Sequence, residues 1–71
     1  MKRYRVLILP KKGLLDPEGR AIKEMLVENG YPVKDVQVGK VLEITVDGDV
    51  NVDQMVQKFL VNPLIEEYLI E

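Results

Sequence analysis

The hydrophobic and polar positions along the chain alternate with a period of two in two stretches, and each stretch predicts a β-strand. Residues 4–9 (YRVLIL) place apolar side chains on both faces of the predicted strand, which indicates that the strand is central in its sheet. This strand ends at Pro10, which cannot donate a ladder hydrogen bond. In the other stretch, Leu42, Ile44 and Val46 alternate with polar residues and predict a further strand.

Two other stretches repeat their apolar residues every three to four positions, as an amphipathic helix does. The first begins with Asp16 as an N-cap and Pro17 in the first helical position, and it ends at Gly30. The second begins after Asn51, which opens a sequence resembling a capping box, and it ends before Pro63. The apolar stripes are Ala21, Ile22, Met25 and Leu26 in the first helix, and Val52, Met55, Val56, Phe59 and Leu60 in the second.

Two shorter stretches complete the predicted fold. Val36 and Val38 indicate a strand that joins the strand at 42–46 through a two-residue reversal at Gly39-Lys40. Residues 67–70 indicate a terminal strand, which the crossover rule places beside residues 4–9. The order is βαββαβ, and we predict that residues 1–71 form one α+β domain of the ferredoxin-like kind. Its antiparallel sheet carries both helices on one face.

The opposite sheet face is left uncovered in this arrangement. Leu7, Leu9 and Val41 are expected to point to it, and a bare apolar sheet face is more typical of a subunit interface than of a solvent boundary. Small domains gain stability from disulfides, metals or oligomerisation, and this chain has no Cys and no His. The sequence therefore predicts that the chain associates with itself.

Composition and charge narrow the classes of partner. The chain is 46% hydrophobic and 31% charged, which supports a packed core rather than intrinsic disorder. Its net charge of −2 provides no positive field for a nucleic acid or an anionic membrane surface. The apolar run at Val6–Leu9 is too short for a signal peptide or a membrane span, so we expect a cytoplasmic protein.

Reactive side chains are scarce. The sequence has no Cys, His or Ser, and Thr45 lies in a predicted strand, so a nucleophile beside a base is missing. Asp47 and Asp49 are typical of a turn and supply too few oxygens for a calcium loop. Residues 11–13 (KKG) lack the spacing of a phosphate-binding loop. We therefore predict no catalytic, cofactor-binding or metal-binding residue in this chain.

Three segments carry a resemblance to a known family. They are residues 15–19 (LDPEG) with Ala21, residues 36–40 (VQVGK) with Glu43, and residues 60–68 (LVNPLIEEY). In their order and spacing, and over nearly the whole chain, these segments resemble PurS, the small subunit of the multi-subunit form of phosphoribosylformylglycinamidine synthase. One departure is Gln37, which stands where the family often has an arginine.

The resemblance implies a non-catalytic subunit of a complex in de novo purine biosynthesis. Its partners would be a large ATP-using synthetase subunit and a glutaminase subunit, which the small subunit bridges as a homodimer or a tetramer for ammonia transfer. ATP and magnesium would be used by the complex and not bound by this chain. The residues that the matching motifs assign to partner contact are Leu15, Asp16, Pro17, Gly19, Gly39 and Lys40.

The residues by themselves leave other interpretations open. Asp16, Pro17 and Gly19 are also ordinary helix-start signals, so a folding role explains them equally well. The same element order occurs in ligand-sensing regulatory modules that dimerise, and in small enzymes of the acylphosphatase type. A regulatory module should bind a metabolite on its own, whereas an enzyme of the second type needs a phosphate-cradling loop that residues 10–13 do not supply.

Overall fold

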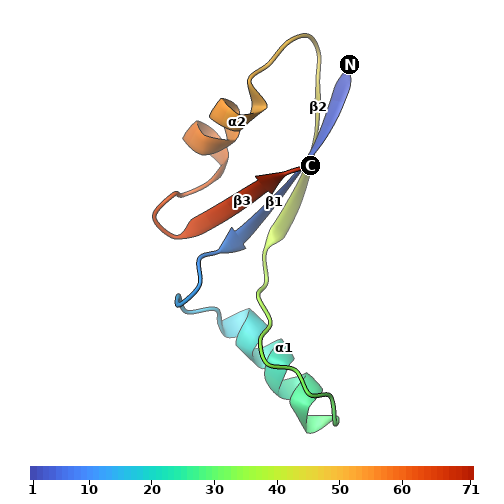
Figure 1. The fold of residues 1–71 in the computed structure, drawn as a ribbon, viewed down its shortest axis with the longest axis vertical. Coiled ribbons are helices and arrows are strands. Elements are labelled where there is room, and N and C mark those ends of the chain that lie inside the picture. The colour runs from blue at the N-terminus through green and yellow to red at the C-terminus, as the bar shows by residue number, and fades with distance from the viewer.

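The computed structural model describes all residues 1–71 as three strands and three helical segments (Figure 1). In chain order they are β1 (Lys2–Pro10), α1 (Pro17–Glu28), β2 (Lys40–Val46), α2 (Val52–Met55), the π-helical turn η1 (Val56–Leu60) and β3 (Glu66–Ile70). No helix is long and apolar enough to cross a membrane. The predicted α+β composition is confirmed.

The sheet has the strand order β2-β1-β3, and both pairings are antiparallel. Val6 in β1 lies opposite Leu42 on one side and Ile70 on the other. The central position of β1 and the place of the terminal strand beside it are therefore as predicted. Because opposed residues share a face, this register places Tyr4, Val6 and Ile8 on one face and Leu7 and Leu9 on the other.

The hydrophobic core lies between the first of these faces and the helical segment α2–η1. Its buried members are Val6, Ile8, Val52 and Val56. Asn51 begins α2 as predicted, because its side-chain oxygen accepts a hydrogen bond from the amide of Gln54 at 3.1 Å. Half-buried side chains packed around this core are Tyr4, Leu42, Ile44, Met55, Leu60, Val61, Tyr68 and Ile70.

The prediction of the second apolar stripe is wrong at Phe59, whose side chain is 80% exposed. The stripe assumes an α-helix throughout, but residues Val56–Leu60 form a π-helical turn, and the amide of Val61 donates to the carbonyl of Val56 at 3.2 Å. A bond across five residues widens the turn and rotates the residues within it. Phe59 is thereby turned away from the sheet.

The strand predicted at Val36 and Val38 is absent, and so is the reversal at Gly39-Lys40. Residues 31–39 run back along α1 as an extended connection, and Lys40 is the first residue of β2. The physical reason is that the amide of Val38 donates to the Asp16 carboxylate instead of to a neighbouring strand. The sheet therefore has three strands.

The first helix does not lie on the sheet face, contrary to the prediction. Figure 1 shows α1 beyond the end of β1 and β2, connected to them by two segments that run side by side. We call residues 11–39, which contain α1 and both connections, the arm. No residue of the arm belongs to the hydrophobic core, and Gly19 is its only buried residue.

The arm makes the molecule long and thin. Its principal extents are 49 × 25 × 13 Å, and its radius of gyration is 15.4 Å. A compact domain of this length has a radius of gyration of about 11 Å. The elongation reflects a helix that is separate from the sheet.

Candidate partner interface

The junction between the sheet and the arm is organised by the carboxylate of Asp16. One oxygen accepts a hydrogen bond from the amide of Gly19 at 3.1 Å, which caps α1 as the sequence predicts. The other oxygen accepts from the amide of Val38 at 3.0 Å, across 22 residues of sequence. Asp16 thus joins the chain that enters α1 to the chain that returns from it.

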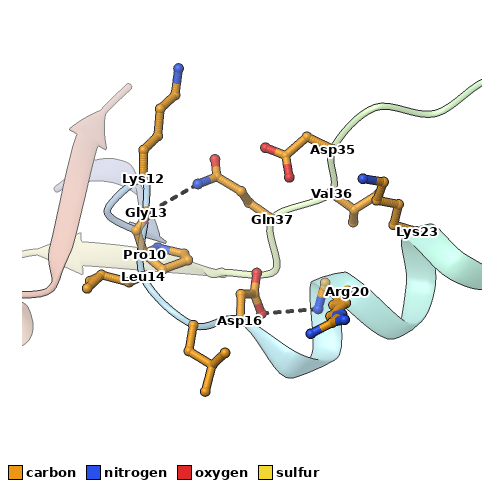
Figure 2. A pocket seen from close by; sticks show the side chains of 12 residues that line it. Pro10, Lys12, Gly13, Leu14, Asp16, Arg20, Lys23, Asp35, Val36 and Gln37 are labelled. Carbon is orange, nitrogen blue, oxygen red and sulfur yellow. Dashed lines mark hydrogen bonds between the residues drawn. The ribbon is translucent and has the colours of Figure 1, made fainter.

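A second bridge crosses the same junction (Figure 2). The side-chain amide of Gln37 donates to the carbonyl of Pro10 at 3.3 Å, so it connects the returning segment to the end of β1. Gln37 is the position at which the sequence departs from the resembling family. Its role here is to satisfy a backbone carbonyl, which a neutral amide does without adding a charge.

Two glycines permit the close approach of backbone segments at this junction. A Cβ on Gly19 would overlap the carbonyl oxygen of Val36, and a Cβ on Gly39 would overlap the carbonyl oxygen of Ile8. Neither position requires a left-handed backbone, so the constraint is lack of space. The motif residues Asp16, Gly19 and Gly39 therefore serve to hold the junction together.

The remaining predicted contact residues, Leu15, Pro17 and Lys40, are exposed, and Leu15 is 83% exposed. They line one open groove of about 560 Å³ together with Asp16 and Gly39. The adjoining groove in Figure 2, of about 480 Å³, includes Gly19. The structure therefore brings all six predicted residues to the junction, three as structural supports and three as accessible surface.

An apolar patch lies on the sheet face opposite α2, close to the junction. It consists of Leu7, Leu9, Val41 and Leu69. Leu7 lies opposite both Val41 and Leu69, which confirms that the predicted residues share the uncovered face. Leu69 is missed by the sequence analysis, although its alternation with Tyr68 and Ile70 in the last strand would have identified its face.

The opposite end of that face is charged. Arg5 and Glu43 lie directly across from each other on β1 and β2 and form an exposed ion pair of 3.1 Å. An exposed pair of this kind contributes only about 0.2–1 kcal/mol to the free energy of unfolding. The apolar patch therefore lies between this ion pair and the exposed Glu67, which is opposite Leu9 on the same face at the end nearest the arm.

One side-chain hydrogen bond joins the two layers of the sheet domain. The hydroxyl of Tyr68 on β3 donates to the carboxylate of Asp53 on α2. This bond raises the pKa of Tyr68 above its usual value of 10.0, because it stabilises the protonated hydroxyl. No group of three or more acidic, Cys or His side chains is placed to hold a metal ion.

The comparisons with known proteins cover nearly the whole chain. The family model PurS, described as phosphoribosylformylglycinamidine (FGAM) synthase, matches residues 3–71. The phosphoribosylformylglycinamidine synthase subunit PurS of Bacillus subtilis is 38% identical over 77 residues, covering 100% of this chain and 92% of that protein. The PurS subunit of Methanocaldococcus jannaschii is also 38% identical, with 100% and 94% covered.

Solved structures of PurS proteins support the same family assignment. The crystal structure of Methanocaldococcus jannaschii PurS superposes with a TM-score of 0.80, covering 100% of this chain and 94% of that one. PurLQS from Thermotoga maritima contains a chain that superposes with a TM-score of 0.77 at 29% identity, with 100% and 98% covered. These neighbours support the ferredoxin-like α+β class, and they do not favour a ligand-sensing module. This chain belongs to the PurS family of phosphoribosylformylglycinamidine synthase subunits.

Proposed function

We propose that this chain is the non-catalytic subunit that joins a large ATP-dependent synthetase subunit to a glutaminase subunit in phosphoribosylformylglycinamidine synthase. The complex acts in the cytoplasm, in de novo purine biosynthesis, and uses ATP and magnesium on its other subunits. The observation that carries this proposal is the family match over residues 3–71. PurLQS of Thermotoga maritima, which contains a related chain, supports the idea of a shared assembly.

The mechanism that we propose is positioning. Ammonia released by the glutaminase is diluted in solvent unless the accepting site is held nearby. A subunit that binds both partners raises the effective concentration of one at the other without taking part in bond formation. The uncovered surfaces of this chain, which are the apolar patch, the arm and the groove beside Lys40, offer more than one contact area.

We further propose that the working form of the subunit is a homodimer. The support is the apolar patch, in which Leu9, Val41 and Leu69 are 41%, 54% and 61% exposed. Clusters of exposed apolar side chains of this kind are typical of protein interfaces. Leu15, Pro17 and Lys40 then remain available as contacts to the larger subunits, with Asp16, Gly19 and Gly39 supporting them.

Co-purification tests this proposal. The chain, a synthetase subunit and a glutaminase subunit from the same cell are mixed in all pairs and as a trio, and the mass of each species is measured by light scattering. We expect a complex of all three that contains two copies of this chain. If this chain binds neither large subunit in the trio, with ATP, magnesium and glutamine present, the proposal is wrong.

A further inference from the structure

The π-helical turn η1 places the only phenylalanine of the chain on the surface. The side chain of Phe59 is 80% exposed, whereas Val56, in the same turn, is completely buried. An ordinary α-helix would turn Phe59 toward the sheet with the rest of the apolar stripe. Turns of the π kind are rare, and they are found frequently at functional sites. The exposure of Phe59 is therefore a structural feature for which a function should be sought.

Phe59 borders an open groove on the helical segment α2–η1, which we call the outer groove. Its volume is about 300 Å³, and its lining residues are Val50, Asn51, Gln54, Met55, Lys58 and Phe59. Val50 is 42% exposed and Met55 is half-buried, so the groove has apolar walls beside the aromatic ring. This volume is at the lower limit for a small-molecule pocket, so the groove is better suited to one or two side chains of another protein.

The outer groove carries charge of one sign. Lys58 is its only charged lining residue, and Lys58 takes part in neither of the two ion pairs of the chain. The acid of α2, Asp53, is engaged elsewhere, because its carboxylate accepts hydrogen bonds from the hydroxyl of Tyr68 and from the side-chain amide of Gln57. The groove therefore complements an apolar side chain that is accompanied by a carboxylate.

The outer groove is separate from the groove of about 560 Å³ that contains Lys40, which we call the junction groove. The two grooves have no lining residue in common. Figure 1 shows α2 beside the sheet and at the far end of the molecule from α1, whereas the junction groove lies where the arm begins. A subunit that joins two different proteins needs two surfaces that are occupied at the same time. The two grooves meet this requirement.

We propose that the outer groove is the docking site for one of the two large subunits, and that the junction groove is the docking site for the other. In the outer groove, Phe59 packs against an apolar side chain of the large subunit, and Lys58 pairs with a carboxylate beside it. Aromatic residues are enriched in the buried centre of protein interfaces, and a charge at the rim favours fast and specific association. This inference rests on the function proposed above and assigns a separate surface to each partner.

Photocrosslinking in the assembled complex tests this assignment. The natural chain has no cysteine, so a single introduced cysteine is the only site for a benzophenone label on it. Gln54→Cys places the label in the outer groove, and Leu15→Cys places it in the junction groove. Lys34→Cys, at an exposed residue that lines neither groove, is the control. With ATP, magnesium and glutamine present, we expect the first two labels to crosslink to different large subunits, each at least about tenfold above the control.

The other crosslinking patterns contradict the proposal. If both labels crosslink to the same large subunit, or if neither exceeds the control, the two grooves do not serve separate partners. A crosslink from Gln54→Cys mainly to a second copy of this chain would assign the outer groove to a contact between copies. If the natural chain binds neither large subunit in co-purification, the proposed function fails as well, so the two failures are distinguished.

Two substitutions test the chemistry of the outer groove. Phe59→Ala and Lys58→Glu should each weaken binding of the large subunit that Gln54→Cys crosslinks by at least about tenfold, and should leave binding of the other large subunit within about twofold. Leu64→Ala, at a residue that is 82% exposed and lines neither groove, should change neither affinity. Circular dichroism checks that all three variants remain folded. Unchanged binding by both groove variants, or an equal loss with Leu64→Ala, would overturn the proposal.

Discussion

At the scale of single residues, Asp16 shows how one side chain fixes the position of a whole helix. Its two oxygens bind two backbone amides from segments that are distant in sequence. A carboxylate is suited to this because it accepts hydrogen bonds through both oxygens. The motif that resembles PurS around residues 15–19 therefore has a structural meaning at Asp16 and Gly19, and leaves Leu15 as its accessible member.

Replacing this carboxylate should destabilise the fold. We expect Asp16→Ala to lower the free energy of unfolding by about 1–3 kcal/mol, because it removes an N-cap and a hydrogen bond between segments. Asp16→Asn keeps one acceptor oxygen and should lose less. Chemical denaturation followed by circular dichroism measures both. Leu15→Ala, at an exposed neighbour, should change the value by less than about 0.5 kcal/mol, and equal losses at both positions would contradict the role of Asp16.

A substitution at Lys40 best distinguishes an effect on partner binding from an effect on folding. It is exposed at the start of β2 and lines the groove beside Leu15 and Pro17. We expect Lys40→Glu to weaken binding to the large subunits while changing the melting temperature by less than about 2 °C, because rim charges act on association more than on folding. Lys34→Glu has the same change of charge outside this groove. Equal weakening by both variants would show that only net charge matters.

At the scale of elements, the helical segment α2–η1 holds the only core of the molecule. Val56 is completely buried, whereas Phe59 three residues later is 80% exposed. We expect Val56→Ala to lower the free energy of unfolding by about 1–3 kcal/mol through loss of buried surface and formation of a cavity. Phe59→Ala should change it by less than about 0.5 kcal/mol. A large loss at Phe59 in urea denaturation would mean that the π-helical turn is wrongly placed.

The hydrogen bond between Tyr68 on β3 and Asp53 on α2 should make the stability of the fold depend on pH in the alkaline range. The pKa of Tyr68 is raised in the folded chain by its hydrogen bond to Asp53, so protonated Tyr68 favours folding. This stabilisation is present below the unfolded pKa of about 10 and is lost as the pH rises through the higher folded pKa. The melting temperature of the natural chain should therefore exceed that of Tyr68→Phe near neutral pH. The difference should shrink as the pH rises above the unfolded pKa and through the raised folded pKa, and a difference that stays constant would contradict this role of the bond.

The elements that the sequence predicts correctly are those specified by nearby residues. Strand β1 follows from alternation and Pro10, and the starts of α1 and α2 follow from Asp16 and Asn51 as caps. The strand at Val36 and Val38 fails because the amide of Val38 donates to the carboxylate of Asp16, which is 22 residues away in sequence. The direction in which α1 leaves the sheet also depends on the hydrogen bond between Gln37 and Pro10. These two residues are far apart in sequence, so no local sequence pattern predicts their contact.

At the scale of the whole molecule, the elongated shape is the feature that most distinguishes this chain from a compact domain. A radius of gyration of 15.4 Å for 71 residues means that the chain exposes more surface than a compact domain of its length does. Both the apolar patch and the arm leave apolar side chains exposed. Such a chain is suited to holding other proteins in place, and its reactive groups are few.

The most direct test of this account is the glutamine-dependent formation of phosphoribosylformylglycinamidine by the two large subunits, measured with and without this chain. We expect the reaction to require the chain when glutamine is the nitrogen source, and to proceed without it when ammonia is supplied directly. Hydrolysis of glutamine without formation of phosphoribosylformylglycinamidine would then show that the two large subunits are uncoupled in the absence of this chain. Full glutamine-dependent product formation by the two large subunits alone would contradict the account.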